Sequence, residues 1–185
     1  MKLSLTTGPW AGLLAALCVA ATPAWASLDV GDKAPDFATS ATLDGKPFRF
    51  ALAESLAKGP VVLYFFPAAF SVGCSIEAHQ FAEAIDKFQA LGATVIGVSG
   101  DDLETLNKFS VTGCQGKFPV ASDADQKIIK SYDAAMSTRA DYANRVSYVI
   151  APNGLITYQY TSLNPYKHVE RTLGALKDLQ ATVKK

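Results

Sequence analysis

The sequence of residues 61–88 is VVLYFFPAAFSVGCSIEAHQFAEAIDKF, and it predicts a buried strand joined to a helix by a short loop. Residues 61–66 are six consecutive apolar residues, mostly β-branched or aromatic, and such a run is typical of a strand buried on both faces. Pro67 ends the strand, because proline has no backbone N–H to donate to a neighbouring strand. From Phe81 onward apolar residues recur at helical spacing, so we expect a helix that packs against the sheet.

Cys74 is the residue in this stretch that can carry chemistry. If the helix begins near Val72 or Gly73, Cys74 lies in its first turn, where unpaired backbone N–H groups and the helix macrodipole favour a thiolate over a thiol. The hydroxyl of Ser71, three residues earlier, can assist. The thiolate is the nucleophilic form of cysteine, so the pattern indicates a reactive thiol.

A cation from elsewhere in the chain would stabilise the thiolate further. Arg145 is the best placed candidate, because it stands at the start of a predicted strand over residues 146–150 that would pack beside residues 61–66. Arg139 lies in a predicted loop and is less constrained. We therefore expect the guanidinium of Arg145 to reach the loop that holds Cys74.

The first 26 residues predict a secretory signal peptide, cleaved before Ser27. A basic residue and a mostly apolar run precede Ala24-Trp25-Ala26, whose small residues supply a cleavage pattern. The apolar run is too short for a permanent membrane span. Lipoprotein processing at Cys18 is an alternative, disfavoured because Leu17 precedes it. We expect an exported protein, periplasmic or secreted, without stable membrane association after cleavage.

Residues 27–185 have a length suited to a single domain with a sizeable core. The 17 basic and 17 acidic residues balance, which gives no electrostatic reason to expect nucleic acid as a partner. Two histidines, His79 and His168, are too few for a metal site, and we expect both at the surface. The sequence suggests no cofactor.

The order of predicted elements is that of an α/β thioredoxin-like fold, with a central mixed sheet flanked by helices and an N-terminal hairpin extension. Residues 93–98 form a second apolar strand, which a βαβ connection makes the parallel neighbour of residues 61–66. The other elements, in chain order, are a hairpin turning at Asp44-Gly45 with Pro47 at a sheet edge, a short helix over 51–58, a helix over 103–113, a helix over 124–134, a loop to 144, a hairpin over 146–160 and a last helix from 164–165.

At the centre of this order, the motif Pro67-Ala-Ala-Phe-Ser71-Val-Gly-Cys74, with Arg145 downstream, resembles the peroxiredoxins. Together with Ala34-Pro-Asp-Phe37 it is similar to their bacterioferritin-comigratory-protein branch, and the resemblance covers essentially all of residues 27–185. It implies a thiol peroxidase that acts on hydrogen peroxide or organic hydroperoxides.

The resemblance also implies roles for single residues. Cys74 would attack the peroxide O–O bond, while Ser71 and Arg145 hydrogen-bond and polarise the peroxide. Pro67 would shield the pocket, and Glu77 would orient Arg145. An alternative for Glu77 is an acid near a helix N-terminus that only interacts with the macrodipole.

The resemblance gives Cys114 the role of resolving cysteine. Many members of the branch carry this cysteine five residues after the peroxidatic one, where this chain has His79, and others carry it at the end of the next helix. The implied product is an intramolecular Cys74–Cys114 disulfide, formed after local unwinding and reduced by a thioredoxin-like donor. Such a protein needs no partner subunit, so we expect a monomer. A permanent structural disulfide between the two cysteines is the alternative.

Two other functions of this fold class fit the residues around Cys74 poorly. A thiol-disulfide oxidoreductase needs a Cys-x-x-Cys pair, but Glu77 occupies the position of the second cysteine. A copper chaperone or a thioredoxin-like binding protein would need Cys-x-x-x-Cys, but Ala78 occupies that position.

Overall fold

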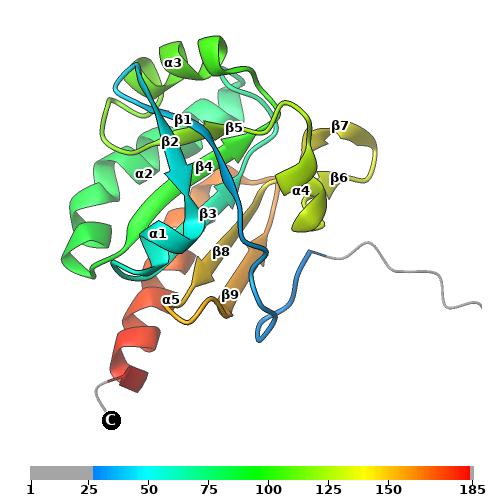
Figure 1. Ribbon diagram of the computed structural model, residues 1–185. Coiled ribbons are helices and arrows are strands. Elements are labelled where there is room, and N and C mark those ends of the chain that lie inside the picture. Colours follow the sequence, from blue (N-terminus) through cyan, green and yellow to red (C-terminus); the bar gives the residue numbers. More distant parts are fainter. Residues whose placement is uncertain (1–26, 184–185) are drawn as a thin grey trace, which may run out of the picture.

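The computed structural model describes residues 27–183, so the predicted signal peptide over residues 1–26 lies outside the described residues. Its centre is a seven-stranded mixed sheet in the order β2-β1-β5-β4-β3-β8-β9 (Figure 1). The predicted central mixed sheet is therefore confirmed. The strands are β1 (Ala38–Leu43), β2 (Lys46–Ala51), β3 (Val61–Phe65), β4 (Thr94–Ser99), β5 (Val120–Ser122), β8 (Val146–Ile150) and β9 (Ile156–Thr161).

Helices cover both faces of the sheet and create two apolar cores. Successive side chains of β3 point to opposite faces of the sheet and so enter the two cores in turn. Leu63 packs in one core and Tyr64 in the other. The helices are α1 (Leu52–Leu56), α2 (Val72–Ala90), α3 (Leu103–Thr112), α4 (Lys127–Ser131), the 3-10 turn η1 (Pro165–Lys167) and α5 (His168–Val183). The core that contains Tyr64 also receives side chains from α2, α3 and α5.

β3 is buried along its whole length, and its neighbours place the functional residues. It pairs in parallel with β4, as the βαβ pattern predicts, and antiparallel with β8. The register opposes Phe65 to Val146. The residue after β3 and the residue before β8 are therefore neighbours, which brings Arg145 to the loop that follows β3.

Both predicted hairpins are confirmed. The first turns at Asp44 and Gly45, which both adopt positive φ, at 51° and 70°. Pro47 lies on β2, the edge strand, where its missing N–H costs no ladder hydrogen bond. The second hairpin joins β8 to β9. The predicted helix over 51–58 is present in the shorter form α1.

The predicted helix over 124–134 is wrong in extent. The observed α4 covers Lys127–Ser131 only, because Gln126 adopts the left-handed conformation with φ 58° and interrupts any earlier helical turn. The carboxylate of Asp123 accepts hydrogen bonds from the backbone N–H groups of Ile128 and Ile129, at 3.1 and 2.7 Å, and so caps the helix from a distance.

The predicted loop up to residue 144 is also wrong. Strands β6 (Ala135–Met136) and β7 (Arg139–Ala143) form a separate two-stranded sheet there. A strand of two residues is too short to show an alternating pattern, so periodicity could not reveal it. Within residues 27–183, no helix has the length and apolar character needed to span a membrane.

Candidate active site

Cys74 is the third residue of α2 and is 1% exposed. Ser71 is the N-cap of the helix, in an extended conformation, and its Oγ accepts a hydrogen bond from the backbone N–H of Cys74 at 3.4 Å. The predicted start of the helix is thus confirmed. The sulfur lies where the unpaired N–H groups of the first turn favour negative charge.

The loop over residues 67–71 is tied to the end of β4. The backbone N–H of Ala69 donates to Asp101 Oδ2 at 2.7 Å, and Ser99 Oγ donates to the same oxygen at 2.8 Å. Phe70 adopts a left-handed conformation, with φ 63°, which a bulky residue rarely does without support from its surroundings. Pro67 is half-buried at the start of this loop. Asp101 therefore anchors the loop, a role that no local sequence pattern predicts.

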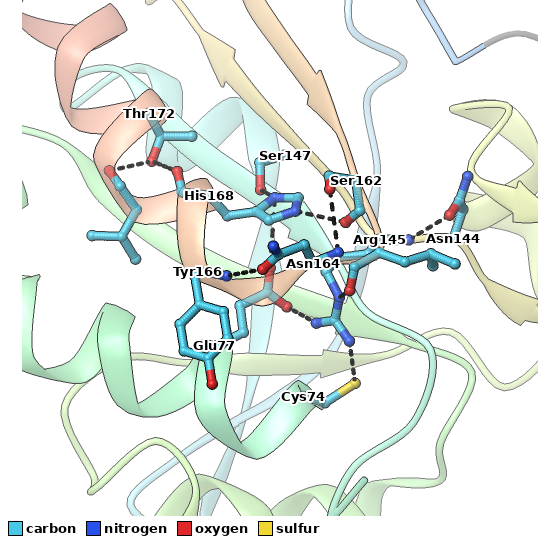
Figure 2. A network of polar contacts seen from close by, with 12 residues as sticks. Cys74, Glu77, Asn144, Arg145, Ser147, Ser162, Asn164, Tyr166, His168 and Thr172 are labelled. Carbon is cyan, nitrogen blue, oxygen red and sulfur yellow. Dashed lines mark hydrogen bonds and ion pairs between the residues drawn. The ribbon is translucent and has the colours of Figure 1, made fainter. Parts of the chain in front are cut away.

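The side chain of Arg145 makes three polar contacts, one of them with Cys74. Its Nη2 donates to Cys74 Sγ at 3.3 Å, its Nη1 donates to Glu77 Oε2, and its Nε donates to the carbonyl oxygen of Leu163 at 3.2 Å (Figure 2). The predicted approach of this guanidinium to Cys74 is confirmed. Since three different nitrogens are committed, the plane of the guanidinium is fixed.

The surroundings of Arg145 leave little room for displacement. Its side chain is 5% exposed, and a Cβ on Gly73 would lie 3.1 Å from Nη2, so glycine there permits the close approach. Burial alone would lower the pKa of Arg145, but Glu77 and Cys74 outweigh it and hold that pKa above its ordinary value. The guanidinium therefore stays charged beside the sulfur.

Glu77 is fully buried beneath Arg145 rather than a solvated acid near the helix start. Burial raises its pKa to about 8, although Arg145 acts in the opposite direction. Among the residues that the structure describes, Glu77 Oε1 has no hydrogen-bond partner. The contact with Arg145 is the one that the family resemblance implied.

His168 was expected at the surface, and this prediction is wrong. The residue is fully buried at the start of α5, and burial lowers its pKa to about 4. A signal was present in the sequence: His168, Thr172 and Leu176 are spaced by four and share the buried face of α5. A histidine on the apolar face of a helix can equally lie at the edge of that face, where it is exposed, so the spacing alone does not distinguish a buried His168 from a surface one.

Cys114 follows the end of α3, as predicted, and is fully buried. Its backbone N–H donates to the carbonyl oxygen of Phe109 at 3.1 Å. Burial raises the pKa of its thiol, so Cys114 is neutral in this state. Cys114 and Cys74 belong to the same apolar cluster, and both are free thiols.

The remaining candidates lie away from this cluster of contacts. His79 is exposed, as expected, with its Nδ1 2.9 Å from the carbonyl oxygen of Ser75. Arg139 lies over the ring of Tyr142, 3.7 Å from its centroid, and pairs with Asp141. The structure thus brings together Ser71, Cys74, Glu77 and Arg145 and leaves Arg139 elsewhere.

The chain is similar in sequence to plant peroxiredoxin Q proteins. The chain is 35% identical over 151 residues to the chloroplastic peroxiredoxin Q of Oryza sativa subsp. japonica, a match that spans 80% of this chain and 67% of the relative. It is 32% identical over 158 residues to the chloroplastic peroxiredoxin Q of Sedum lineare, spanning 84% and 82% of the two chains.

Solved structures share the fold. The peroxidoxin BcpB of Mycobacterium tuberculosis superposes with a TM-score of 0.71 at 27% identity, over 81% of this chain and 97% of that one. The reduced 2-Cys peroxiredoxin of Plasmodium vivax superposes with a TM-score of 0.76 at 23% identity, over 84% and 99% of the two chains. These matches confirm the thioredoxin-like fold.

A family model covers most of the described chain. Residues 30–159, which include Cys74, Glu77, Cys114 and Arg145, match the model of the AhpC/TSA family. The peroxiredoxin Q relatives and the BcpB structure support the branch that the sequence motif indicated. This chain belongs to the AhpC/TSA family, the family of the peroxiredoxins.

Proposed function

We propose that the protein is a thiol peroxidase that reduces hydrogen peroxide or organic hydroperoxides at Cys74. The observation that carries the proposal is the 3.3 Å contact between Arg145 Nη2 and Cys74 Sγ in a buried site at a helix N-terminus. A thiolate beside a fixed guanidinium is a nucleophile with a charge stabiliser already in place. Family membership supports the same chemistry.

In the first step, the Cys74 thiolate attacks one oxygen of the peroxide, and the O–O bond breaks. The sulfur becomes a sulfenic acid, and the other oxygen leaves as hydroxide or alkoxide and takes up a proton to give water or an alcohol. Negative charge develops on the leaving oxygen, so Arg145 stabilises the transition state. Ser71 Oγ, which caps the helix beside Cys74, would hydrogen-bond the peroxide.

In the second step, the Cys114 thiol attacks the Cys74 sulfenic acid, a disulfide forms, and water leaves. A disulfide requires Cα atoms about 4.4–6.8 Å apart. Cys74 lies in a helical turn and Cys114 is held by a backbone hydrogen bond to Phe109, so we expect the end of α3 and the first turn of α2 to unwind locally when the disulfide forms.

We propose that a thioredoxin-like dithiol donor restores the two thiols, and that export by residues 1–26 places the cycle outside the cytosol. An intramolecular disulfide needs no second chain, which favours a monomer. We infer the donor from the resolving role proposed for Cys114 and the compartment from the predicted signal peptide over residues 1–26.

Peroxide consumption by the wild type, Cys74→Ser and Cys114→Ser tests the proposal. With one equivalent of peroxide and no reductant, the wild type should lose two hydrogens in intact mass and gain a Cys74–Cys114 cross-link. Cys114→Ser should gain one oxygen on Cys74, and Cys74→Ser should consume nothing. If the wild type consumes no more peroxide than Cys74→Ser, the proposal is wrong.

The same protein tests the alternative of a permanent structural disulfide. Structural disulfides have reduction potentials below about −300 mV, whereas catalytic ones lie higher. We expect the Cys74–Cys114 pair to equilibrate at a higher potential, because its formation disrupts the helix start that Ser71 caps. A potential below that limit, with no peroxide consumption, would favour the structural alternative.

A further inference from the structure

The ring of His168 lies behind Arg145 and contacts residues of α2, of β8 and of the loop after β9. Its Nε2 is 2.9 Å from the carbonyl oxygen of Ser162, its Nδ1 is 2.8 Å from Ser147 Oγ, and the same Nδ1 is 3.6 Å from Glu77 Oε1 (Figure 2). The side chains of His168 and Glu77 are fully buried, and Ser147 is buried as well. Solvent therefore does not screen the contact between the ring and the carboxyl group.

Hydrogen-bond chemistry assigns the protons of this ring. A carbonyl oxygen only accepts, so Nε2 carries the hydrogen that it donates to Ser162. A neutral imidazole has one N–H group, which leaves Nδ1 bare, and the hydroxyl of Ser147 donates to it. The bare Nδ1 then faces Glu77 Oε1.

The lone pair of Nδ1 accepts from Ser147, and at 3.6 Å Nδ1 makes no hydrogen bond with Glu77 Oε1, but a carboxylate charge that faces this electron-rich nitrogen in a buried site is unfavourable. Among the described residues, Glu77 Oε1 has no hydrogen-bond partner, so no donor stabilises the ionised carboxylate at that oxygen. Burial raises the pKa of Glu77 to about 8 and lowers the pKa of His168 to about 4, and both shifts place the proton on the carboxyl group at neutral pH.

Other charged and titratable groups surround the pair. Arg145 contacts Glu77 from the start of β8, and Cys74 faces Arg145 from the same helix as Glu77. Tyr64 approaches from β3, and the ring of Tyr160 on β9 lies 4.8 Å from that of His168. If Cys74 is a thiolate and Glu77 is protonated, the charges of Cys74 and Arg145 cancel; an ionised Glu77 would add a negative charge and compete for the guanidinium.

We propose that His168 is a positioning residue of the active site, which keeps Glu77 protonated at neutral pH so that Arg145 directs its charge to Cys74. The proposal rests on the proposed function in that it deepens the role of the same site. His168 is buried and makes no direct contact with the sulfur of Cys74. It acts on the sulfur through Glu77 and Arg145.

Nitrogen NMR of the ¹⁵N-histidine-labelled protein tests the proton assignment without any need for catalysis. The chain has two histidines, so His79→Gln, at an exposed position, identifies the signals of His168. We expect a protonated Nε2 and a bare Nδ1 at pH 7, and a step in the Nδ1 shift near pH 8 as Glu77 ionises. The step should vanish in Glu77→Gln. A protonated Nδ1 with a bare Nε2, or no step in the wild type, would overturn the proposal.

Alkylation of Cys74 by iodoacetamide, in a Cys114→Ser background, tests the effect on the sulfur. His168→Gln retains an N–H group for Ser162 but removes the bare nitrogen, so Glu77 ionises at lower pH. An ionised Glu77 competes for Arg145, so the rate of Cys74 alkylation, measured as a pH profile, should fall by about three- to tenfold at pH 7. His79→Gln should leave the profile unchanged.

A double-mutant cycle separates this role from a merely structural one. In the Glu77→Gln background, His168→Gln should shift the alkylation profile no further; an equal shift there would contradict the proposal. Ser147→Ala, a small change, removes a donor to Nδ1, so the NMR step should move to higher pH. If the NMR and alkylation results are as expected but the wild type does not consume peroxide, the proposed function fails and the proton assignment stands.

Discussion

The guanidinium of Arg145 and the sulfur of Cys74 lie 3.3 Å apart, although 71 positions separate the two residues in the chain. The antiparallel pairing of β3 with β8 creates this proximity, because it sets the residue before β8 beside the loop after β3. The sheet thus positions Arg145 beside Cys74, and the loop over residues 67–71 supplies Ser71, the N-cap of the helix that carries Cys74.

Arg145→Lys tests the guanidinium as a charge stabiliser. Lysine keeps the positive charge but cannot bond Cys74, Glu77 and the Leu163 carbonyl at once, so we expect the rate constant for peroxide reduction to fall by about 10²–10³. Arg139→Lys, an exposed residue that contacts Tyr142, is the matched control and should leave the rate unchanged. Equal effects of both variants would contradict a direct role for Arg145.

Gly73→Ala tests how closely Arg145 must approach. The new Cβ would lie 3.1 Å from Nη2, so the guanidinium must shift. Because a small displacement of a group that stabilises the transition state lowers the rate, we expect peroxide reduction to slow by about tenfold. Gly174→Ala is the matched control, because α5 leaves open space at that position. That control should stabilise the protein by about 0.5–1 kcal/mol in urea unfolding and retain full activity.

Cys114→Ser tests the resolving step. The first reaction of Cys74 with peroxide should keep its rate, because Cys114 is a neutral, buried thiol that takes no part in it. Turnover should stop, and excess peroxide should convert Cys74 to sulfinic acid, detectable as a gain of two oxygens in intact mass. Sustained turnover of this variant with a dithiol donor would show that another thiol resolves Cys74.

The stability of Cys74→Ser, a variant in which no thiolate can form beside Arg145, should fall between about pH 6.5 and pH 8. Glu77 has a raised pKa, about 8, so in this range the folded state holds a proton that the unfolded state has released, and unfolding becomes easier as the pH rises. His168 has a lowered pKa, about 4, and acts in the opposite direction only up to about pH 6.5, where the unfolded histidine loses its proton.

The expected loss over this window is about 1–2 kcal/mol, because the slope of 1.36 kcal/mol per pH unit is halved at pH 8, where Glu77 is half ionised. Urea unfolding of Cys74→Ser at pH 6.5 and 8 measures it. Glu77→Gln in the same background cannot titrate at position 77, so its stability should change little over the same window. A stability of Cys74→Ser that is flat or rises from pH 6.5 to 8 would contradict a protonated Glu77 in the folded state.

Most of the fold follows from local sequence patterns. The apolar runs of β3 and β4, with a helical stripe between them, predict a βαβ unit, and Asp44-Gly45 predicts a hairpin because its backbone needs positive φ. These elements are specified by residues near one another in the chain. The two-residue strand β6 is not, because tertiary pairing with β7 alone defines it.

The candidate site could be predicted only in part, for a similar reason. Cys74 and Ser71 carry a local signature, since a helix start is encoded by a few neighbouring residues. His168 and Asp101 act through partners that are distant in the chain, on α2 and in the loop before it. A single sequence contains no record of those contacts; the spacing of His168, Thr172 and Leu176 indicates only that the histidine lies on the buried face of its helix.

The rate of peroxide reduction at Cys74 tests the account most directly. Competition kinetics against a reference thiol should give the reduced wild type a second-order rate constant at least about 10²–10³ above that of free cysteine at the same pH, the factor that a fixed electrostatic stabiliser supplies. Cys74→Ser should show none of this reaction. A wild-type rate equal to that of free cysteine, or one that survives in Cys74→Ser, would contradict the account.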